Sequence, residues 1–444
     1  MDKTKKINIL TGIVLAGFLI AIAYHYILGT FLHLNYPYNT FLFKPNHKFT
    51  DFNEDLSFPT LEFNPYITHT GHPNYFPFGM LYTYFLRFLP HIVSLSLFYL
   101  IVITYFIFYN FNNFRKDLPP KFHFKTLLKT LIISCLSYPF LIWFDRGNLD
   151  GAIFIFISLA VYFFIKEKYT ISSLIFSIPI AMKGTGLLLL PLLLAKKKFK
   201  EFFYCLFLVL FLTIISLLFA KGGVIANCKC LLKHMHYFSY HYIILDMGLG
   251  FSASLFGVVK VIIYWINGCI KSLSNATYWI KTKDGLWPFI ASKYSFVYYY
   301  DNVHEIVSKA LKIFLPIAGI STLAAAAYSV FIEKELWKQV LLLLICSIIF
   351  SPVSADYKLL TLYIPLCLFL NSKNKSKNDI WYTILFGLIL IPKNYLQFLN
   401  FNELNYFNIS IILNPIILLI MTVMIITEGF KSYKTDLSNN RRQN

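Results

Sequence analysis

The sequence predicts an all-α polytopic membrane protein with about 10–13 transmembrane or half-membrane helices, because a chain inside a bilayer must satisfy its own backbone hydrogen bonds. Hydrophobic residues make up 57% of the chain and aromatic residues 19%, and the mean hydropathy is +0.61. Charged residues make up only 14%, against about 25% in soluble domains. Apolar segments also recur along most of the chain and are separated by short basic loops.

Twelve apolar segments are candidates for helices that enter the membrane. An α-helix needs about 20 residues to cross the hydrocarbon core, so the shorter segments are expected to be tilted, paired or only partly inserted. The first segment follows Lys3, Lys5 and Lys6 and lacks a small-residue cleavage site, which indicates a retained span rather than a signal peptide. The segments are 7–28, 91–111, 127–143, 149–165, 169–182, 187–195, 202–220, 309–331, 339–350, 359–370, 380–392 and 409–427.

The positive charge of the chain is concentrated in the short loops between these segments. A net charge of +19 is compatible with nucleic-acid binding, but small basic clusters that alternate with apolar spans are typical of cytoplasmic loops. We therefore expect no nucleic-acid partner, and we place these loops on the cytoplasmic side. The clusters are Arg115 with Lys116, Lys121 and Lys125; Lys166 with Lys168; Lys196–Lys198 with Lys200; Lys334 with Lys338; Lys373, Lys375 and Lys377; and Lys431 with Lys434.

The segments 169–182 and 187–195 are interpreted as a hairpin of half-membrane depth. At 1.5 Å per residue they cover about 21 Å and about 14 Å, which is short of the roughly 30 Å hydrocarbon core. One continuous helix would be long enough, but it would move every later basic loop to the other side of the membrane. The hairpin therefore places Lys183 at a tip on the non-cytoplasmic side.

Two long stretches do not fit as spans, and both are placed on the non-cytoplasmic side. Residues 29–90 are expected to carry helices along the membrane surface. Residues 221–308 contain an apolar piece, 251–266, which could span, re-enter or lie in the interface. We expect one membrane domain over residues 1–431 and a disordered cytoplasmic tail over residues 432–444.

The turn between the segments 127–143 and 149–165 is more polar than a tight turn needs. It carries Asp145, Arg146 and Asn148 at the membrane boundary. A charged group at membrane depth costs about 2.5–3.5 kcal/mol even on lenient insertion scales, so it usually faces protein or a water-filled cavity and marks function. An ordinary solvated turn is the alternative.

The other unusual polar residues are predicted on the same side of the membrane as this turn. Acids together with fixed cations at one membrane face suit a reaction in which a base activates a hydroxyl and cations hold a leaving phosphate. The residues concerned are Asp51, Glu54, Asp55, Asp145, Arg146, Asn148, Lys183, Asp246, Ser351, Ser354, Asp356, Tyr357 and Lys358.

Asp51 and Lys183 each have a structural alternative. Asp51 lies within one helical turn of Glu54 and Asp55, so an acidic solvated face would also explain it. Lys183 could cap the C-terminus of a helix, where a cation is favourable.

Simple pairing is the alternative for the remaining charges. Arg146 could pair with Asp145 or Asp150, and Asp356 could pair with Lys358. Each of these pairs would be structural only.

The sequence gives no support for a metal site. His69 and His72 are three residues apart, but no acidic or cysteine partner accompanies them. Cys228 and Cys230 are too close together for the usual zinc spacing, and Cys135, Cys205, Cys346 and Cys367 lie in apolar segments. No metal is therefore expected.

Other functional classes remain open. A lipid-linked glycan flippase or another transporter would favour charges at mid-span and internal repeats, which are not evident. A glycan polymerase or ligase would favour paired arginines in a large late loop, and residues 221–308 contain no arginine. A non-catalytic membrane scaffold is disfavoured by the one-sided polar cluster.

Four stretches, in order along the chain, match elements of one enzyme family. They are Thr50-Asp51-Phe52; Asn64-Pro65-Tyr66 with Asn74-Tyr75-Phe76-Pro77-Phe78; Arg146-Gly147-Asn148 with Met182-Lys183-Gly184; and Ser351-Pro352 with Asp356-Tyr357-Lys358. In these elements the chain resembles the glycosyltransferase-C superfamily, in particular the bacterial family-87-type polyprenyl-phosphate-dependent mannosyl- and arabinosyltransferases. Phe76 replaces the first proline of a Tyr-Pro-Pro element, so the resemblance is incomplete there.

The resemblance implies an inverting, metal-independent transfer of one sugar, mannose-like or a pentose, from a polyprenyl-phosphate donor to a glycan or glycolipid acceptor. It implies no cofactor beyond the lipid-linked donor, and an active site on the non-cytoplasmic face of a bacterial plasma membrane. It also implies Asp51 as the general base. The candidate phosphate ligands are Arg146, Lys183 and Lys358, and the candidate supporting residues are Asp145, Asn148, Glu54, Asp55, Asp356 and Tyr357.

Overall fold

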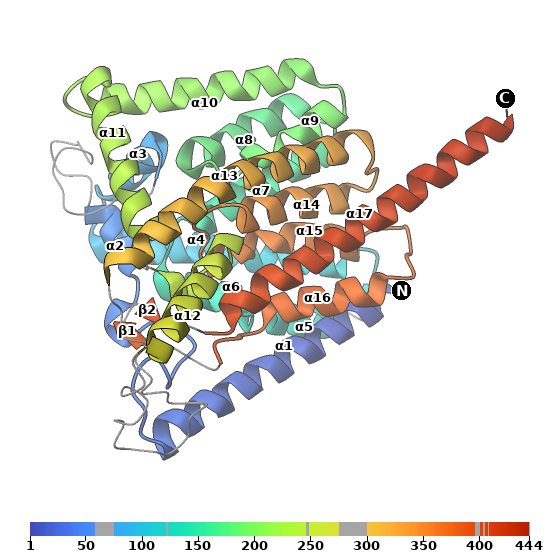
Figure 1. Cartoon of the computed structure of the whole chain (residues 1–444). Helices are drawn as coiled ribbons and strands as arrows, with labels where there is room; N and C mark the ends of the chain where they lie inside the picture. The colour runs from blue at the N-terminus through green and yellow to red at the C-terminus, as the bar shows by residue number, and fades with distance from the viewer. Residues whose placement is uncertain are drawn as a thin grey trace.

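The computed structural model shows a bundle of helices that run roughly side by side (Figure 1). It describes residues 1–57, 75–120, 123–245, 248–274, 300–395, 400–402, 405–406 and 408–443. The expected positions Asp246, Asn64-Pro65-Tyr66, His69 and His72 lie outside the described residues. Strand structure in the described part is limited to a short antiparallel hairpin, β1 (Asn400–Asn402) with β2 (Asn405–Tyr406), so the all-α expectation is confirmed apart from this hairpin.

Within the described residues, five helical segments are long and apolar enough to cross a membrane. They are α1 (Lys3–Tyr26) with its extension η1 (Ile27–Phe31), α4 (His91–Arg115), α10 (Phe199–Phe219), residues Val303–Phe331 of α13 (Tyr300–Phe331) and residues Ser410–Tyr433 of α17 (Ser410–Gln443). A sixth crossing results if α5 (His123–Cys135) and α6 (Tyr138–Arg146), which bend by 59°, count as one span. These helices confirm a polytopic membrane architecture.

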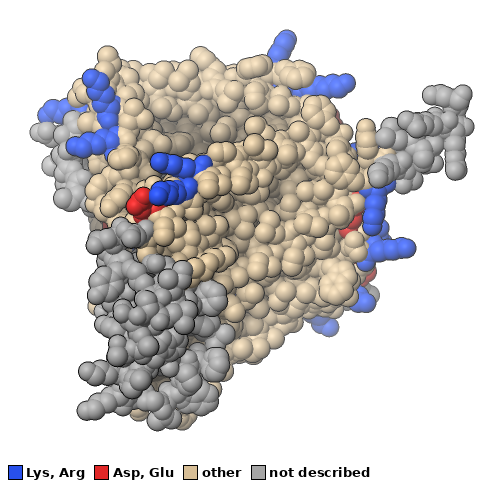
Figure 2. Space-filling view, in the orientation of Figure 1, with Lys and Arg blue, Asp and Glu red and all other residues tan. Residues whose placement is uncertain are grey.

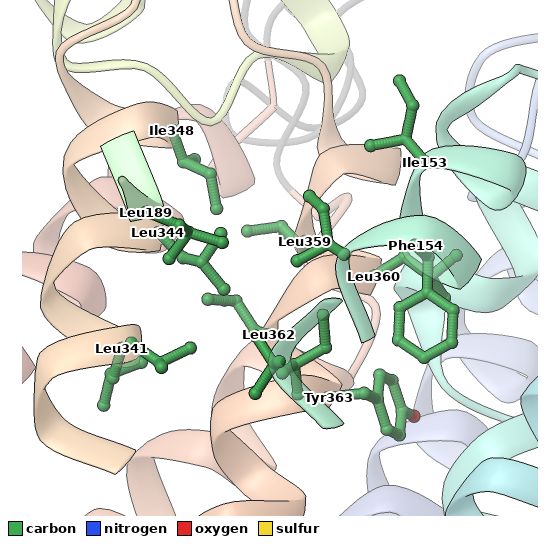
Figure 3. Packing of buried hydrophobic residues seen from close by; sticks show 14 of the residues in the cluster. Ile153, Phe154, Leu189, Leu341, Leu344, Ile348, Leu359, Leu360, Leu362 and Tyr363 are labelled. Carbon is green, nitrogen blue, oxygen red and sulfur yellow. The ribbon is translucent and has the colours of Figure 1, made fainter. Parts of the chain in front are cut away.

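Shorter apolar helices fill the interior of the bundle. They are α7 (Asp150–Ile165), α8 (Tyr169–Lys183), η4 (Leu187–Leu189), α9 (Pro191–Ala195), α14 (Leu336–Ile349), η8 (Asp356–Leu362), α15 (Tyr363–Leu370) and α16 (Asp379–Leu390). Leu341, Leu344 and Ile348 of α14 face aliphatic side chains of η4 and η8 in the core (Figure 3). Inside a bilayer, helices associate through such van der Waals packing, because lipid tails are as apolar as leucine.

The basic loops lie together at one end of the bundle, which we call the basic end. Lys3 Nζ donates hydrogen bonds to Asn113 O (2.8 Å) and to Asn371 Oδ1 (2.7 Å). Lys338 Nζ lies 3.0 Å from the carboxylate of Glu428. Charged side chains gather at this end, and a broad apolar face separates them from the charges near α11 (Val224–Phe238) (Figure 2). That the basic end faces the cytoplasm stays a prediction.

The hairpin expected around Lys183 is present in the structure. Lys198 Nζ lies 4.8 Å from the centre of the Tyr169 ring, so the chain that follows α9 returns to the start of α8. Helix α8 ends at Lys183, and Gly184 closes it in the left-handed conformation (φ +75°), as glycine commonly does at a helix C-terminus. Lys183 therefore lies at the end of the bundle opposite the basic end, which we call the site end.

Two expectations about helix continuity are wrong. The segment 127–143 is not one helix, because α5 ends at Cys135 and α6 begins at Tyr138 with Pro139 in its first turn, where proline lacks the N–H that a continuing helix would need. The tail 432–444 is not disordered along its described length, because α17 continues to Gln443. Residues 431–443 contain neither proline nor glycine, so nothing in the sequence ends the helix there.

Short elements cover the site end. They are η2 (Pro45–His47), α2 (Thr50–Ser57), α3 (Pro77–Leu86), α11, η5 (Ser239–Ile244), η6 (Leu249–Phe251) and α12 (Leu255–Ser274). The apolar piece 251–266 contributes to α12, which packs its Phe256 and Val261 against Val307 of α13 and Ile411 of α17. Helix α12 is thus attached to the outside of two long helices.

This arrangement predicts opposite accessibility for the two ends. The Lys309 side chain is 70% exposed, and Lys309 lies 22 residues, about 33 Å, from the basic end of α13. After replacement of the native cysteines, Lys309→Cys should react with an impermeant thiol reagent in sealed right-side-out vesicles. Lys375→Cys, exposed in a loop of the basic end, should react only after permeabilisation. Labelling of position 375 in sealed vesicles with protection of position 309 would reverse the orientation.

Candidate active site

The turn between α6 and α7 is held in a fixed shape by aromatic side chains. Gly147 adopts φ +69° and donates its N–H to Trp143 O (2.8 Å), which closes α6. Trp143 Nε1 in turn donates to Asn148 O (2.7 Å), and the Tyr99 hydroxyl donates to Phe144 O (2.6 Å). These bonds fix the direction in which the side chains on either side of Gly147 point.

Arg146 and Asn148 both bind Asp51, which lies in the first turn of α2. The Arg146 guanidinium forms an ion pair with Asp51 Oδ1, and Asn148 Nδ2 donates to Asp51 Oδ2 (2.9 Å). Arg146 also donates to His47 O (3.2 Å) and lies 4.2 Å above the Phe43 ring. The ion-paired side chains are only 12% and 14% exposed, so the pair is shielded but still reachable.

Lys183 joins the same network from the end of α8. Its Nζ lies 2.6 Å from Asp150 Oδ2 and 3.2 Å from Asn148 Oδ1. The ammonium is also 5.0 Å from the centre of the Tyr75 ring and 5.3 Å from that of Tyr357, within the range of cation–π attraction. Asn148 therefore bridges the Asp51 pair and the Lys183 pair.

Lys358 is the third cation of the site. Burial, together with the positive charge of Lys183, lowers the pKa of the Lys358 ammonium to about 8, and the charge of Asp150 acts in the opposite direction. Its Nζ donates to Val353 O (3.3 Å) within its own turn. Arg146, Lys183 and Lys358 thus come from three separate parts of the chain; Arg146 pairs with Asp51 and Lys183 with Asp150, whereas Lys358 binds a main-chain oxygen.

Asp51 has two acidic neighbours in α2, Glu54 and Asp55, and the structure describes the side chain of Glu54 only. Burial raises the pKa of the Glu54 carboxyl, the nearby Asp51 raises it further, and Arg146 lowers it. A second carboxyl close to the first is thereby shifted toward its neutral form. Asp55 belongs to α2, and its side chain lies outside the described set.

Asp145 does not pair with Arg146. Its Oδ2 accepts a hydrogen bond from Phe43 N (3.2 Å), and its main-chain oxygen accepts one from Phe49 N (2.8 Å). Asp145 therefore holds the segment that leads into α2 and brings Asp51 to the site.

Asp356 and Lys358 do not pair with each other either. The Asp356 carboxylate is fully buried and accepts hydrogen bonds from the Tyr138 hydroxyl (3.0 Å) and from Asn414 Nδ2 (2.9 Å). Tyr357, between them in sequence, turns its ring toward Lys183. The structure thus brings together most of the expected residues, but Asp356 is buried in the interior of the bundle and bonds to Tyr138 and Asn414 instead.

Sequence reasoning assigned no site role to three participants, namely the Lys183 partner Asp150, which was named only as a possible partner of Arg146, and the aromatic rings of Phe43 and Tyr75. Asp150 is the first residue of α7, where a helix N-terminus favours a carboxylate, and this was the available signal. Tyr75 lies within a stretch of the family resemblance, and the neighbouring Phe76 N donates to Met182 O (2.9 Å). The contacts of Phe43 gave no sequence signal.

The arrangement suits the binding of an anion beside a proton acceptor. Cations presented by fixed elements stabilise a developing or existing negative charge without reorganisation, and a carboxylate at their edge can accept a proton. The aromatic rings around Lys183 also offer flat apolar surfaces.

The Gly147 turn predicts a large effect of one methyl group. A Cβ at Gly147 would lie 2.8 Å from the Tyr99 hydroxyl and 2.9 Å from Phe52 Cβ. Gly147→Ala should therefore lose about 1–2 kcal/mol to the left-handed backbone and about 1–3 kcal/mol more to overpacking. Thermal unfolding in detergent measures the loss.

Gly248→Ala is the matched control for Gly147→Ala. Gly248 has a similar left-handed backbone (φ +74°), and no described atom lies within 4 Å of its hypothetical Cβ. It should show only the backbone effect. Equal losses in the two variants would contradict the tight packing of the turn.

The lowered pKa of Lys358 predicts its chemical reactivity. Amine acylation requires the neutral form, so labelling of Lys358 should reach half its maximal rate near pH 8. Lys183→Gln removes a neighbouring positive charge and leaves Asp150 unpaired, and both changes raise the pKa of Lys358. The labelling midpoint, followed by mass spectrometry, should shift upward; an unchanged midpoint would show that the two ammonium groups do not interact.

One comparison with known proteins identifies a related family. Residues 74–239 match the family model described as Glycosyltransferase family 87. The matched part is less than half of the chain; it contains Arg146, Asn148 and Lys183, whereas Asp51 and Lys358 lie outside it. No curated protein and no solved structure matches the chain significantly. The family match supports a glycosyltransferase of the glycosyltransferase-C type.

Proposed function

We propose that this protein transfers a single sugar, mannose-like or a pentose, from a polyprenyl-phosphate donor to a hydroxyl of a glycan or glycolipid acceptor. The observation that supports this most is Asp51, a carboxylate held directly against Arg146 and one amide away from Lys183. The match to the family-87 model supports glycosyl transfer in general. The donor class rests on the motif resemblance together with the three cations.

In the proposed reaction the acceptor oxygen forms a bond to the anomeric carbon while the bond from that carbon to the phosphate oxygen breaks. The acceptor proton passes to Asp51, and the polyprenyl phosphate leaves with the bonding electron pair. A single displacement inverts the anomeric carbon. Because the phosphate is already charged when it leaves, it needs fixed cations rather than a proton donor.

The contacts of Asp51 suggest an order for these events. Both carboxylate oxygens are engaged, one by Arg146 and the other by Asn148. An acceptor hydroxyl needs one of them, and phosphate is a strong competing partner for a guanidinium, which binds it in a bidentate manner. We infer that the donor phosphate draws Arg146 from Asp51, so that the base becomes free once the donor is bound.

The orientation of the site is part of the proposal. The site lies at the end of the bundle opposite the basic loops, and basic loops favour the cytoplasmic side. Transfer would then occur on the non-cytoplasmic face of a bacterial plasma membrane. The lipid-linked donor reaches such a site within the membrane.

The first test concerns the base. Asp51→Asn keeps the size of the side chain and one acceptor oxygen but removes the proton acceptor. Loss of a general base typically lowers the rate by about 10²–10⁴-fold. The assay is transfer of radiolabelled sugar from polyprenyl phosphate in membranes, with donor binding measured separately and expected to persist.

Glu54→Gln and Asp55→Asn are the matched controls for Asp51→Asn, because they remove carboxylates from the same short helix. They should retain most of the turnover. Near-normal turnover of Asp51→Asn with loss in either control would assign the base to that neighbour. Full activity in all three would remove the base from this helix.

The second test concerns the phosphate. Arg146→Gln and Lys183→Gln each remove a charged donor, and a hydrogen bond to a charged group is worth about 1.5–3 kcal/mol, or about ten- to a hundredfold in binding. The apparent KM for the donor should rise accordingly in both variants. Lys309→Gln, exposed on α13, is the control cation and should not change it. Unchanged donor kinetics in Arg146→Gln and Lys183→Gln would leave both residues with a structural role.

A further inference from the structure

Asp356 lies in a buried polar cluster beneath the site. Its side chain is fully buried, and its two oxygens accept hydrogen bonds from Tyr138 of α6 and Asn414 of α17. Tyr138 and Asn414 are also fully buried. One carboxylate thus ties three elements together, and its side chain has no exposed surface.

Each tied element carries or supports part of the site. Helix α6 begins at Tyr138 and ends, eight residues later, at Arg146. The 3₁₀ helix η8 begins at Asp356 and continues with Tyr357 and Lys358. The Asp356–Tyr138 hydrogen bond therefore connects the start of α6, which carries Arg146 at its other end, to the turn that carries Lys358.

A cation accompanies the buried carboxylate. Lys393 is 4% exposed, and its Nζ donates to Leu388 O (2.6 Å) and Ile391 O (2.8 Å) at the C-terminal end of α16. Burial raises the pKa of the Asp356 carboxyl, and the charge of Lys393 acts in the opposite direction. Keeping a carboxylate in this position is costly, and fixing one arrangement of the chain is a role that buried charges have in some proteins.

The same turn is held from its other side by main-chain contacts. Ser252 and Ala355 form an isolated antiparallel bridge, and Ala253 N donates to Ser354 O (2.7 Å). The segment 351–358 is therefore held by main-chain contacts to the residues that precede α12 and by the hydrogen bonds of the buried Asp356. Helix α6 and η8 also pack directly against each other, and Tyr357 lies against the apolar cluster that contains Tyr138 and Ile142. The Asp356–Tyr138 hydrogen bond adds a polar contact of fixed direction to this packing.

We propose that Asp356 is a positioning residue that, through Tyr138 and Asn414, sets the place of Tyr357 and Lys358 relative to Arg146 and Lys183. It does not contact substrate. The consequence for sugar transfer rests on the proposed function, whereas the consequence for the geometry of Lys358 does not.

Tyr138→Phe tests this with the smallest change, because it removes one buried hydroxyl and leaves the ring. The first readout needs no substrate: the pH at which Lys358 reaches half its maximal acylation rate. Release of the turn moves Lys358 away from Lys183 and toward solvent, so the midpoint should rise from about 8 by at least about half a pH unit. Asp356→Asn should shift it in the same direction.

Tyr328→Phe is the matched control. The Tyr328 hydroxyl also joins a helix to α17, by a bond of 2.9 Å to Ile425 O, and the residue is 7% exposed, but it lies near the basic end. It should lower thermal stability without moving the Lys358 midpoint. If Tyr138→Phe does not fold, Asn414→Leu provides the same test from α17.

The second readout is donor kinetics. The KM for the polyprenyl-phosphate donor should rise about three- to tenfold in Tyr138→Phe, as for loss of one ordinary hydrogen bond, with a smaller change in kcat. An unchanged Lys358 midpoint in both Tyr138→Phe and Asp356→Asn would overturn the positioning role, whatever the activity. A shifted midpoint together with a wild-type protein inactive on every polyprenyl-phosphate sugar would keep the positioning role and overturn the proposed function.

Discussion

The rest of the site depends on one network of ion pairs and hydrogen bonds, which runs from Arg146 through Asp51, Asn148 and Lys183 to Asp150. Its members come from α2, α6, α7 and α8, so the pairing also holds four elements in one register. Removal of one partner from a buried charge pair typically costs about 3–5 kcal/mol, because the remaining charge is left uncompensated. A phosphate can replace a carboxylate as the partner of these cations without exposing them. The contacts that stabilise the fold are therefore the contacts that an anionic substrate would exchange.

The short helices explain how such charges are tolerated in an apolar bundle. Helix α8 is too short to cross the hydrocarbon core, and it stops at Lys183, where Gly184 turns the chain back. Helix α6 stops at Arg146, where Gly147 does the same. Arg146 and Lys183 are thus each the last residue of their helix, where a cation faces the negative end of the helix dipole. The long helices are apolar enough to cross a membrane, and the face between the charged ends carries few charged side chains (Figure 2).

The sequence predicted the fold class, the gathering of the basic loops at one end and the hairpin at Lys183, because charge distribution and segment length determine these features. It also predicted that Asp51, Arg146 and Asn148 lie on the same side of the bundle, where the structure shows them in contact. It did not predict which charges pair: Arg146 bypasses the adjacent Asp145 for Asp51, and Asp150 takes Lys183. Pairing across elements depends on the direction of each side chain at a turn, which composition and spacing do not encode. The burial of the Asp356 side chain could not be predicted from the sequence for the same reason, since neighbouring residues of a turn point to different sides.

The central claim is that the cations of the site hold the phosphate of a polyprenyl lipid while Asp51 stands free beside it. A cryo-electron microscopy structure of the full chain with bound polyprenyl monophosphate tests this most directly. We expect phosphate density within hydrogen-bonding distance of Arg146 and Lys183, with the Arg146 guanidinium moved off the Asp51 carboxylate. Phosphate density at the basic end, or in the site with the Arg146–Asp51 pair unchanged, would contradict it.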